Sequence, residues 1–228
     1  MSKVCVLFAM EQEAEDFIGL LEAEQITSDP FLIYKKDKVL IAISGIGIVN
    51  AATCLTYLNS EYENIDLFIN SGLVGCINSD FKRLDKLLVS KAYYGAANAT
   101  GFGYAYGQIP KMPRYFTSDS IVNKEFKSFI GNIEYTNIAT SDIFISKKEQ
   151  VEFFVNKIGD KIDVVDMECN GFFQAAYNLN KPIISFKIVS DTMSEEPNEF
   201  QFSEILAKAQ GTLANDLIKY VKHKKYTM

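Results

Sequence analysis

Three apolar stretches of the sequence each end in an acidic residue. They are Val4–Glu13 (VCVLFAMEQE), Val164–Glu168 (VVDME) and Ile183–Asp191 (IISFKIVSD). Open α/β sheets place their ligand sites at the carboxyl ends of strands, so we expect the three carboxylates to meet at one edge of a sheet. Such a set can perform general acid and base catalysis. Taken singly, each carboxylate is also compatible with a helix cap or a surface position.

Other familiar catalytic arrangements are missing from the sequence. The single histidine, His223, lies in a basic C-terminal segment, where we expect a solvated side chain, and this excludes a Ser-His-Asp triad. The cysteines Cys5, Cys54, Cys76 and Cys169 stand singly in apolar surroundings. We therefore expect no metal site and no cofactor, and buried free thiols typical of a reducing cytoplasm.

Two glycine-containing segments follow predicted strands. Ser44–Gly47 (SGIG) precedes a predicted helix, whose first N–H groups are available to a ligand. It lacks the full dinucleotide-binding pattern, because position 50 is Asn50. We interpret Asn70–Gly75 (NSGLVG) as a second strand that ends in a glycine turn. Each segment by itself is also compatible with a tight turn that binds nothing.

The apolar periodicity alternates between strands and helices, which predicts an α/β fold with a mostly parallel or mixed central sheet flanked by helices. We predict one domain over residues 1–228. The predicted strands are Val4–Ala9, Phe31–Lys35, Val39–Ser44, Asp66–Ser71, Leu87–Tyr94, Tyr135–Thr140 and Ile183–Ser190. The predicted helices are Gln12–Glu24, Val49–Leu58, one starting near Lys147, Met167–Leu179 and Ser203–His223.

Composition narrows the possible partners. The 228 residues are 48% hydrophobic and carry a net charge of −6, which argues against a nucleic-acid or membrane partner. Arg83 and Arg114 are the only arginines. The first residues do not have the pattern of a signal peptide, so we expect a cytoplasmic protein. The segment Ala96–Tyr115 is irregular and rich in glycine and aromatic residues, which predicts a binding or interface segment.

Several segments resemble, in order along the chain, those of the methylthioadenosine/S-adenosylhomocysteine nucleosidases of the purine nucleoside phosphorylase superfamily. The similar segments are Ala9–Glu13 (AMEQE), Ser44–Gly47, Ile69–Gly75 (INSGLVG), Phe102–Pro110 (FGYAYGQIP), Ser141–Ile145 (SDIFI), Val164–Glu168 and Lys187–Asp191 (KIVSD). The resemblance implies a three-layer nucleoside phosphorylase-like fold. It also implies hydrolysis of the N-glycosidic bond of a 5′-modified purine nucleoside, with water as co-substrate and the purine base as product.

The resemblance further implies roles for the acidic residues. Asp191 matches the aspartate that protonates or hydrogen-bonds N7 of the departing purine. Glu13 matches the carboxylate that orients and deprotonates the attacking water, and Glu168 matches the glutamate that binds the ribose hydroxyls. An acid that donates its proton at pH 7 needs a raised pKa, which burial at the end of a strand can supply.

The rest of the implied site consists of pocket residues and a loop from a second subunit. Phe144 and Ile145 match the pair that holds the base, and Ser190 matches the serine that supports the aspartate. The implied sugar and 5′-substituent pocket contains Met10, Val49, Met167 and Phe202. The implied loop, which the family donates across a homodimer interface, contains Phe102, Tyr104 and Pro110.

The sequence departs from the family pattern at two positions of the implied water and ribose site. Leu73 replaces the usual serine, and Lys187 replaces the usual arginine. Leucine cannot form a hydrogen bond through its side chain, and lysine lacks the planar fork of arginine. Several alternatives therefore stay open: a slower enzyme, another nucleoside substrate, compensation by another group, or an impaired relative that only binds nucleosides. Phosphorolysis is the main enzymatic rival, but neither arginine lies on a motif at the end of a predicted strand and Glu13 would repel phosphate, so hydrolysis is favoured. The sequence leaves the 5′-substituent and the base preference undetermined.

Overall fold

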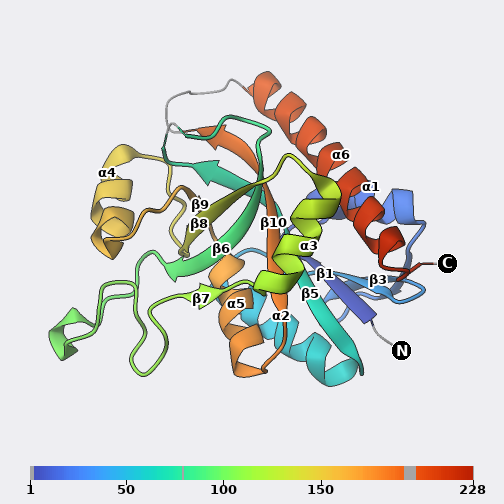
Figure 1. Cartoon of the computed structure of the whole chain (residues 1–228), viewed down its shortest axis with the longest axis horizontal. Helices are drawn as coiled ribbons and strands as arrows, with labels where there is room; N and C mark the ends of the chain where they lie inside the picture. Colours follow the sequence, from blue (N-terminus) through green and yellow to red (C-terminus); the bar gives the residue numbers. More distant parts are fainter. Residues whose placement is uncertain (1–2, 79, 193–198, 228) are drawn as a thin grey trace.

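A mixed β-sheet forms the centre of the molecule (Figure 1). The computed structural model describes residues 3–78, 80–192 and 199–227, and gives the backbone alone for residues 199–203. The strands are β1 (Lys3–Phe8), β2 (Glu24–Thr27), β3 (Leu32–Lys36), β4 (Val39–Ile43), β5 (Ile65–Cys76), β6 (Lys86–Tyr94), β7 (Phe116–Thr117), β8 (Glu134–Thr140), β9 (Val164–Asp166) and β10 (Ile183–Thr192).

Part of the sheet closes on itself around β5. This strand pairs in parallel with β1 and β10 and antiparallel with β9. Strand β10 pairs antiparallel with β6, and the parallel pairs β6–β8 and β8–β9 complete the circuit back to β5. Strands β4, β3 and β2 extend the sheet outward from β1. The parallel strands β1, β5 and β10 therefore bring their carboxyl ends to one edge.

Helices cover both faces of this sheet, which confirms the predicted α/β fold with flanking helices. Helices α1, α3 and α6 pack together on one face, and α2 packs against α5 on the other (Figure 1). A short helix, α4, continues as a π-helical and then a 3₁₀ turn through residue 158. The helix bounds are α1 (Glu11–Leu21), α2 (Ile48–Glu61), α3 (Ser120–Ile130), α4 (Lys148–Gln150), α5 (Cys169–Asn178) and α6 (Glu199–His223).

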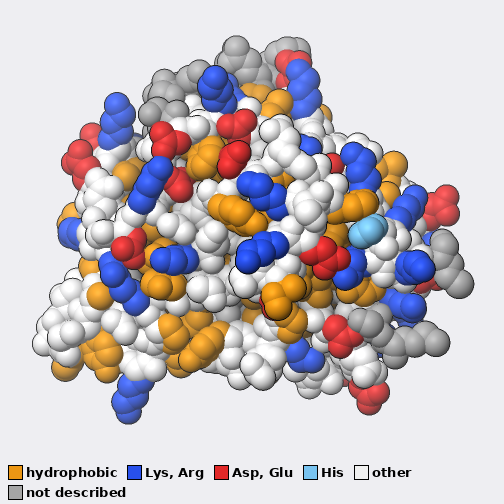
Figure 2. All heavy atoms as spheres, viewed as in Figure 1, with side chains coloured by type: hydrophobic (Ala, Val, Ile, Leu, Met, Phe, Trp, Pro, Cys, Tyr) orange, Lys and Arg blue, Asp and Glu red, His pale blue; other side chains and the backbone are white. Residues whose placement is uncertain are grey.

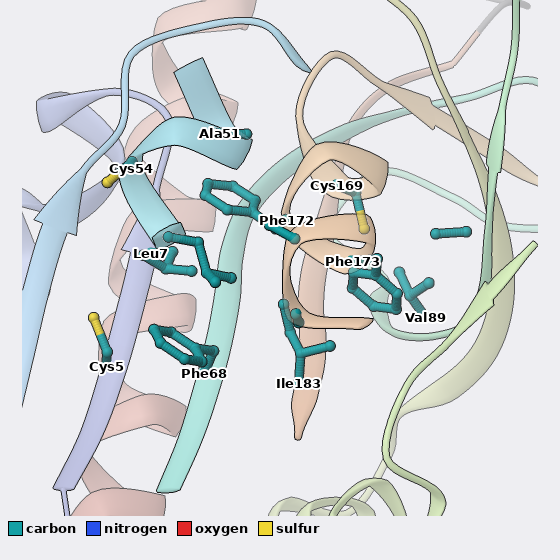
Figure 3. Close-up of a cluster of buried hydrophobic side chains, with 14 of the residues drawn as sticks. Cys5, Leu7, Ala51, Cys54, Phe68, Val89, Cys169, Phe172, Phe173 and Ile183 are labelled. Atoms are coloured by element: carbon teal, nitrogen blue, oxygen red, sulfur yellow. The ribbon is translucent and has the colours of Figure 1, made fainter. Parts of the chain in front are cut away.

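The position of β1 between two layers of helices explains why residues 4–8 are all apolar. Successive side chains of a strand point to opposite faces. Cys5 and Leu7 join the buried cluster beneath α2 and α5 (Figure 3), whereas Val4, Val6 and Phe8 join the cluster beneath α1 and α6. Because both faces are covered, neither set can be polar.

Two predicted boundaries are wrong because they depend on backbone conformation and strand pairing, which hydrophobic periodicity does not reveal. The first helix ends at Leu21, since Glu22 adopts a left-handed conformation (φ 53°) and its N–H donates to the Gly19 carbonyl. The chain then enters β2, whose first residue, Glu24, is the last residue of the predicted helix. Strand β5 does not end at Ser71 in a glycine turn. It continues to residue 76, because Gly72 keeps its place in the ladder opposite β10.

Helix α3 was not predicted, although the sequence holds a signal for it. The Asp119 carboxylate accepts hydrogen bonds from the N–H groups of Ile121 and Val122, each 2.9 Å long, which is the geometry of a helix N-cap. Phe126 lies one turn beyond and is fully buried against the sheet. An acidic cap followed by apolar residues at helical spacing would have identified this helix.

The surface mixes charges of both signs. Figure 2 shows lysine and acidic side chains interspersed over the face viewed. Within the described residues, no helix has the length and apolar character needed to cross a membrane. All four cysteines are buried and free, as predicted.

Gly171 of α5 sets how closely α2 and α5 approach. A Cβ added there would lie 2.5 Å from the backbone oxygen of Ile48 and 3.1 Å from the Ala51 side chain. Because a backbone oxygen cannot move without displacing α2, we predict that Gly171→Ala lowers the free energy of unfolding by about 1–3 kcal/mol. Urea unfolding monitored by circular dichroism measures this change.

The matched control is Gly19→Ala in α1. Nothing lies within 4 Å of a Cβ added at Gly19. Alanine is the better helix former, so we expect this variant to keep or raise stability by up to ~1 kcal/mol. Equal unfolding midpoints for the two variants would contradict the close packing described for Gly171.

Candidate active site

A cavity of about 250 Å³ opens at the carboxyl ends of β1, β5, β9 and β10. Open α/β sheets generally place ligand sites at this edge. Most of the residues predicted for the site line it together: Met10, Glu13, Leu73, Phe144, Ile145, Met167, Glu168, Ser190 and Asp191. The cavity is thus a mainly apolar chamber with a few carboxylates in its wall.

Glu13 enters the cavity from the first turn of α1. Its side chain is buried, and its two oxygens accept hydrogen bonds from backbone N–H groups: Oε1 from Leu73 (2.9 Å) and Oε2 from Met10 (3.2 Å). Burial raises the pKa of Glu13, whereas Lys187 and these two N–H groups act to lower it. The fold therefore fixes both oxygens of this carboxylate.

Strand β5 can pass Glu13 only because residue 72 is glycine. A Cβ there would lie 2.7 Å from Oε1 of Glu13, and the φ of Gly72 is +150°. The next residue, Leu73, donates its N–H to the same oxygen. What the sequence presented as a glycine turn is a strand segment that lets a carboxylate approach its backbone.

Asp191, near the carboxyl end of β10, faces the cavity beside a later point of β5. Its Oδ1 accepts a 2.6 Å hydrogen bond from the Ser190 hydroxyl, and its Oδ2 lies 3.2 Å from where a Cβ of Gly75 would be. Glu13 sits beside Gly72 and Asp191 beside Gly75, three residues apart. At the rise of a strand, this places the two carboxylates beside points of β5 that are roughly 10 Å apart.

Glu168 binds the N-terminus of α2. Its Oε1 accepts the Gly47 N–H at 3.0 Å, and Asp142 accepts the next N–H, that of Ile48, at 2.8 Å. The helix N-terminus that we expected to be available to a ligand is therefore occupied by two carboxylates of the chain itself. Burial and the neighbouring Asp166 raise the pKa of Glu168 to about 7, against the opposing effects of Lys187 and the Gly47 N–H.

Lys187 does not line the cavity, although it was predicted to contact the substrate. Its side chain is 2% exposed and its Nζ lies 3.1 Å from Oδ2 of Asp166. Burial acts to lower the pKa of Lys187, but Asp166 and the other nearby acids raise it above its ordinary value. The ammonium group is thus a buried charge behind the cavity wall.

The remaining predicted residues lie elsewhere. Val49, in the first turn of α2, is 72% exposed and is not among the residues that line the cavity. Phe202 lies in the part of α6 whose side chains are outside the described residues. The residues predicted for a donated loop lie between β6 and β7 and do not line this chain's own cavity. They are Phe102, Tyr104 and Pro110.

Sequence reasoning missed three wall residues that matter for the chemistry. Ile46 and Val165 add apolar surface, and Asp166 adds a fourth carboxylate. Asp166 lies within the segment Val164–Glu168, but no role is predicted for it. A signal was present, because Asp166 directly follows the apolar pair at the end of β9. Among the described residues, no group of three or more His, Cys, Asp and Glu side chains is placed to hold a metal ion.

Comparison with known proteins finds one superfamily. The sequence model of the Phosphorylase superfamily matches residues 3–222. A 5′-methylthioadenosine/S-adenosylhomocysteine nucleosidase of Staphylococcus aureus is 34% identical over 181 residues, covering 78% of each chain. The Bacillus licheniformis nucleosidase of the same name is 29% identical over 230 residues, covering 96% of this chain and 98% of that protein.

A solved structure agrees with these matches. The crystal structure of the Neisseria meningitidis 5′-methylthioadenosine/S-adenosylhomocysteine nucleosidase, in complex with methylthio-immucillin-A, superimposes with a TM-score of 0.87. The two chains are 28% identical, and the superposition covers 98% of this chain and 100% of the other. The likeness therefore extends over the cavity as well as the sheet.

The raised pKa of Glu168 predicts a pH-dependent stability. Its ordinary pKa is 4.5 and its pKa in the folded protein is about 7. Between these values the folded protein retains a proton that the unfolded chain has lost, so the contribution of Glu168 to stability falls as the pH rises from 4.5 to 7. Glu168→Gln removes this effect, and its melting temperature should gain on that of the wild type between pH 5 and pH 8.

Thermal unfolding of both proteins across this range measures the difference. Glu15→Gln on the exposed face of α1 is the control and should follow the wild type at every pH. If the Glu168→Gln and wild-type curves run parallel, Glu168 ionises in the folded protein as it does in the unfolded chain.

Proposed function

The chain belongs to the 5′-methylthioadenosine/S-adenosylhomocysteine nucleosidases of the Phosphorylase superfamily, and from this premise we propose how its cavity works. It is a hydrolase that acts on the N-glycosidic bond of a 5′-modified purine nucleoside, such as 5′-methylthioadenosine or S-adenosylhomocysteine, and releases the purine base. The observation that carries the proposed mechanism is the pair of carboxylates, Glu13 and Asp191, at separate points along one apolar cavity.

In this mechanism one carboxyl group protonates the departing base and the other removes a proton from the attacking water. As the C1′–N9 bond breaks, its electron pair goes to the base and positive charge builds on the sugar. Asp191 donates a proton to N7 of the departing purine, and Ser190 orients its carboxyl group. Glu13 takes a proton from water as the water oxygen bonds to C1′. Each proton transfer is worth roughly 10²–10⁴-fold in rate.

The other wall residues hold the nucleoside. Glu168 accepts hydrogen bonds from the ribose hydroxyls through the oxygen that Gly47 does not occupy. Phe144 offers a largely exposed ring against which a purine stacks, with the buried Ile145 beside it. Met10 and Met167 line the part of the pocket that we assign to the sugar and the 5′-substituent. An apolar pocket suits a thioether better than a free hydroxyl.

Hydrolysis fits this cavity better than phosphorolysis. A phosphate pocket needs cations or free backbone N–H groups. Neither arginine lines the cavity, and Arg114 instead pairs with Asp160 at 3.4 Å. The first N–H groups of α2 already bind carboxylates, which would also repel a phosphate. Lys187 is held by Asp166.

A panel of nucleosides tests the function directly. Methylthioadenosine, S-adenosylhomocysteine, 5′-deoxyadenosine, a futalosine-type nucleoside, adenosine and inosine are each incubated with the protein, with and without phosphate, and base release is followed by HPLC. We expect release from methylthioadenosine that is independent of phosphate. Formation of a sugar phosphate would favour a phosphorylase. Binding without any base release at high protein concentration would favour an impaired, nucleoside-binding relative.

Two variants separate the proposed roles of the carboxylates. Asp191→Asn removes the acid and should lower kcat by roughly 10²-fold or more, while the fold is retained. Glu13→Gln should abolish hydrolysis yet still bind substrate, because it removes a group that acts only on water in the transition state. Steady-state kinetics and calorimetric titration with methylthioadenosine measure the two effects. Near-normal turnover of Asp191→Asn would remove this residue from the mechanism.

We also propose that the protein works as a homodimer in which a loop of one subunit covers the cavity of the other. The segment between β6 and β7 projects from the body of the molecule, and Phe102 at its 3₁₀ turn is 86% exposed (Figure 1). Ile46, Val49 and Phe144 leave further apolar surface exposed at and beside the cavity. Exposed apolar patches of this kind commonly mark interfaces.

Subunit mixing tests the dimer. Phe102→Ala should raise KM, because its own loop no longer completes the neighbouring pocket. Mixing it with the inactive Glu13→Gln protein should restore activity, since some mixed dimers then contain an intact site covered by an intact loop. Light scattering gives the oligomeric state, and a fully active monomer would contradict the proposal.

Two further proposals concern the chain as a whole. We propose that residues 1–228 form one domain, which is supported by a family match spanning residues 3–222. We also propose a cytoplasmic location, supported by four buried cysteines that remain free.

A further inference from the structure

Asp166 has the most hydrogen-bonded carboxylate in the wall of the cavity. Its Oδ1 accepts the Thr140 hydroxyl at 2.6 Å, and its Oδ2 accepts the Cys169 N–H at 3.0 Å and faces Lys187 Nζ at 3.1 Å. The Thr140 hydroxyl oxygen in turn accepts the Asn170 N–H. A side chain that is 2% exposed and held by three donors has little freedom to turn.

Lys187 links this carboxylate to Glu13, which we assign to the attacking water, and to Glu168, which we assign to the ribose. Its field acts on Asp166 first and also on Glu13 and Glu168. Asp166 on β9 pairs directly with this buried ammonium group, and the ammonium charge also acts on Glu13 of α1 and on Glu168 at the start of α5. Taking ions out of water is unfavourable unless each is compensated, so the position of this positive charge affects all three acids.

We propose that Asp166 is a positioning residue for the nucleosidase reaction: by binding Lys187 it fixes where the buried positive charge lies relative to Glu13 and Glu168. The inference rests on the proposed function, since it presumes that Glu13 and Glu168 act on the water and the sugar. Asp166 itself takes no part in bond making or breaking. Its ion pair with Lys187 offsets part of the cost of burying the ammonium group, and Glu13 and Glu168 also favour the charged form of this lysine.

The electrostatic consequence has a definite sign. The titratable groups that face Lys187 are Asp166, Cys169, Glu13 and Glu168. Burial raises the pKa of the Cys169 thiol, so this group stays neutral. When the Asp166 charge is removed, the positive charge of Lys187 is no longer partly neutralised. The pKa values of Glu13 and Glu168 therefore fall. Removing the Lys187 charge raises the pKa of both.

The pH dependence of kcat/KM for methylthioadenosine tests this inference. Glu13 and Glu168 must be ionised to accept protons and hydroxyl hydrogens, so activity falls on the acid side as they become protonated. In Asp166→Asn we expect the acid limb to move to lower pH by ~1 unit, and in Lys187→Met to higher pH by a similar amount. The double variant, which removes both charges, should return the limb toward the wild-type position.

Asp163→Asn is the matched control. Asp163 is also buried and hydrogen-bonded, by Asn78 at 2.6 Å and Thr136 at 3.1 Å, but does not line the cavity. The acid limb of the kcat/KM profile of Asp163→Asn should stay at the wild-type position. A merely structural role for Asp166 would lower activity equally at all pH values, and two single variants without opposite shifts would overturn the proposal.

The outcomes also separate this inference from the proposed function. Absence of base release by the wild-type protein contradicts the function, whereas unshifted limbs in active variants contradict only the role of Asp166. If Asp166→Asn does not fold, the comparison of Lys187→Met with the double variant decides. The double variant removes both members of the Asp166–Lys187 ion pair, and its limb must lie below that of Lys187→Met.

Discussion

The compensation of buried carboxylates is the constraint on which the rest of the structure depends. Glu13, Asp166 and Glu168 are all withdrawn from water at one edge of the sheet, and an uncompensated buried charge would destabilise the fold by several kcal/mol. Backbone N–H groups at strand ends and helix starts supply most of the compensation. The Thr140 hydroxyl and the ammonium group of Lys187 supply further compensation to Asp166. The contacts that compensate these carboxylates form when the chain folds, so folding also places the acidic groups of the cavity.

This arrangement explains how an apolar cavity can carry out ionic chemistry. Donors that the fold has already fixed need not reorganise when charge develops on a substrate, and they act more strongly where water is excluded. The same donors are unavailable to other anions. Glu168 and Asp142 accept the first N–H groups of α2, so these donors are not available to a phosphate.

Strand β5 carries much of this organisation. It pairs with three other strands, so its backbone is held on both sides, and two of its glycines leave room for side chains that approach from other elements. Gly72 admits Glu13, and Gly75 admits Asp191. A rigid strand thereby sets the spacing between the two carboxylates, which a loop could not do with the same accuracy.

The sequence by itself determined the α/β alternation and the set of acidic residues, because strand and helix periodicity and the ends of apolar runs are local properties. It did not reveal the end of α1 at Leu21 or the passage of β5 through Gly72, which depend on backbone conformation and on pairing with a distant strand. Only the tertiary structure decided which donors the carboxylates use. The Gly47 N–H binds a carboxylate 121 residues away, and Lys187 lies behind the cavity wall because Asp166 meets it there. Contacts between segments far apart in the chain leave no local pattern, so the placement of charge in this site follows from the packing.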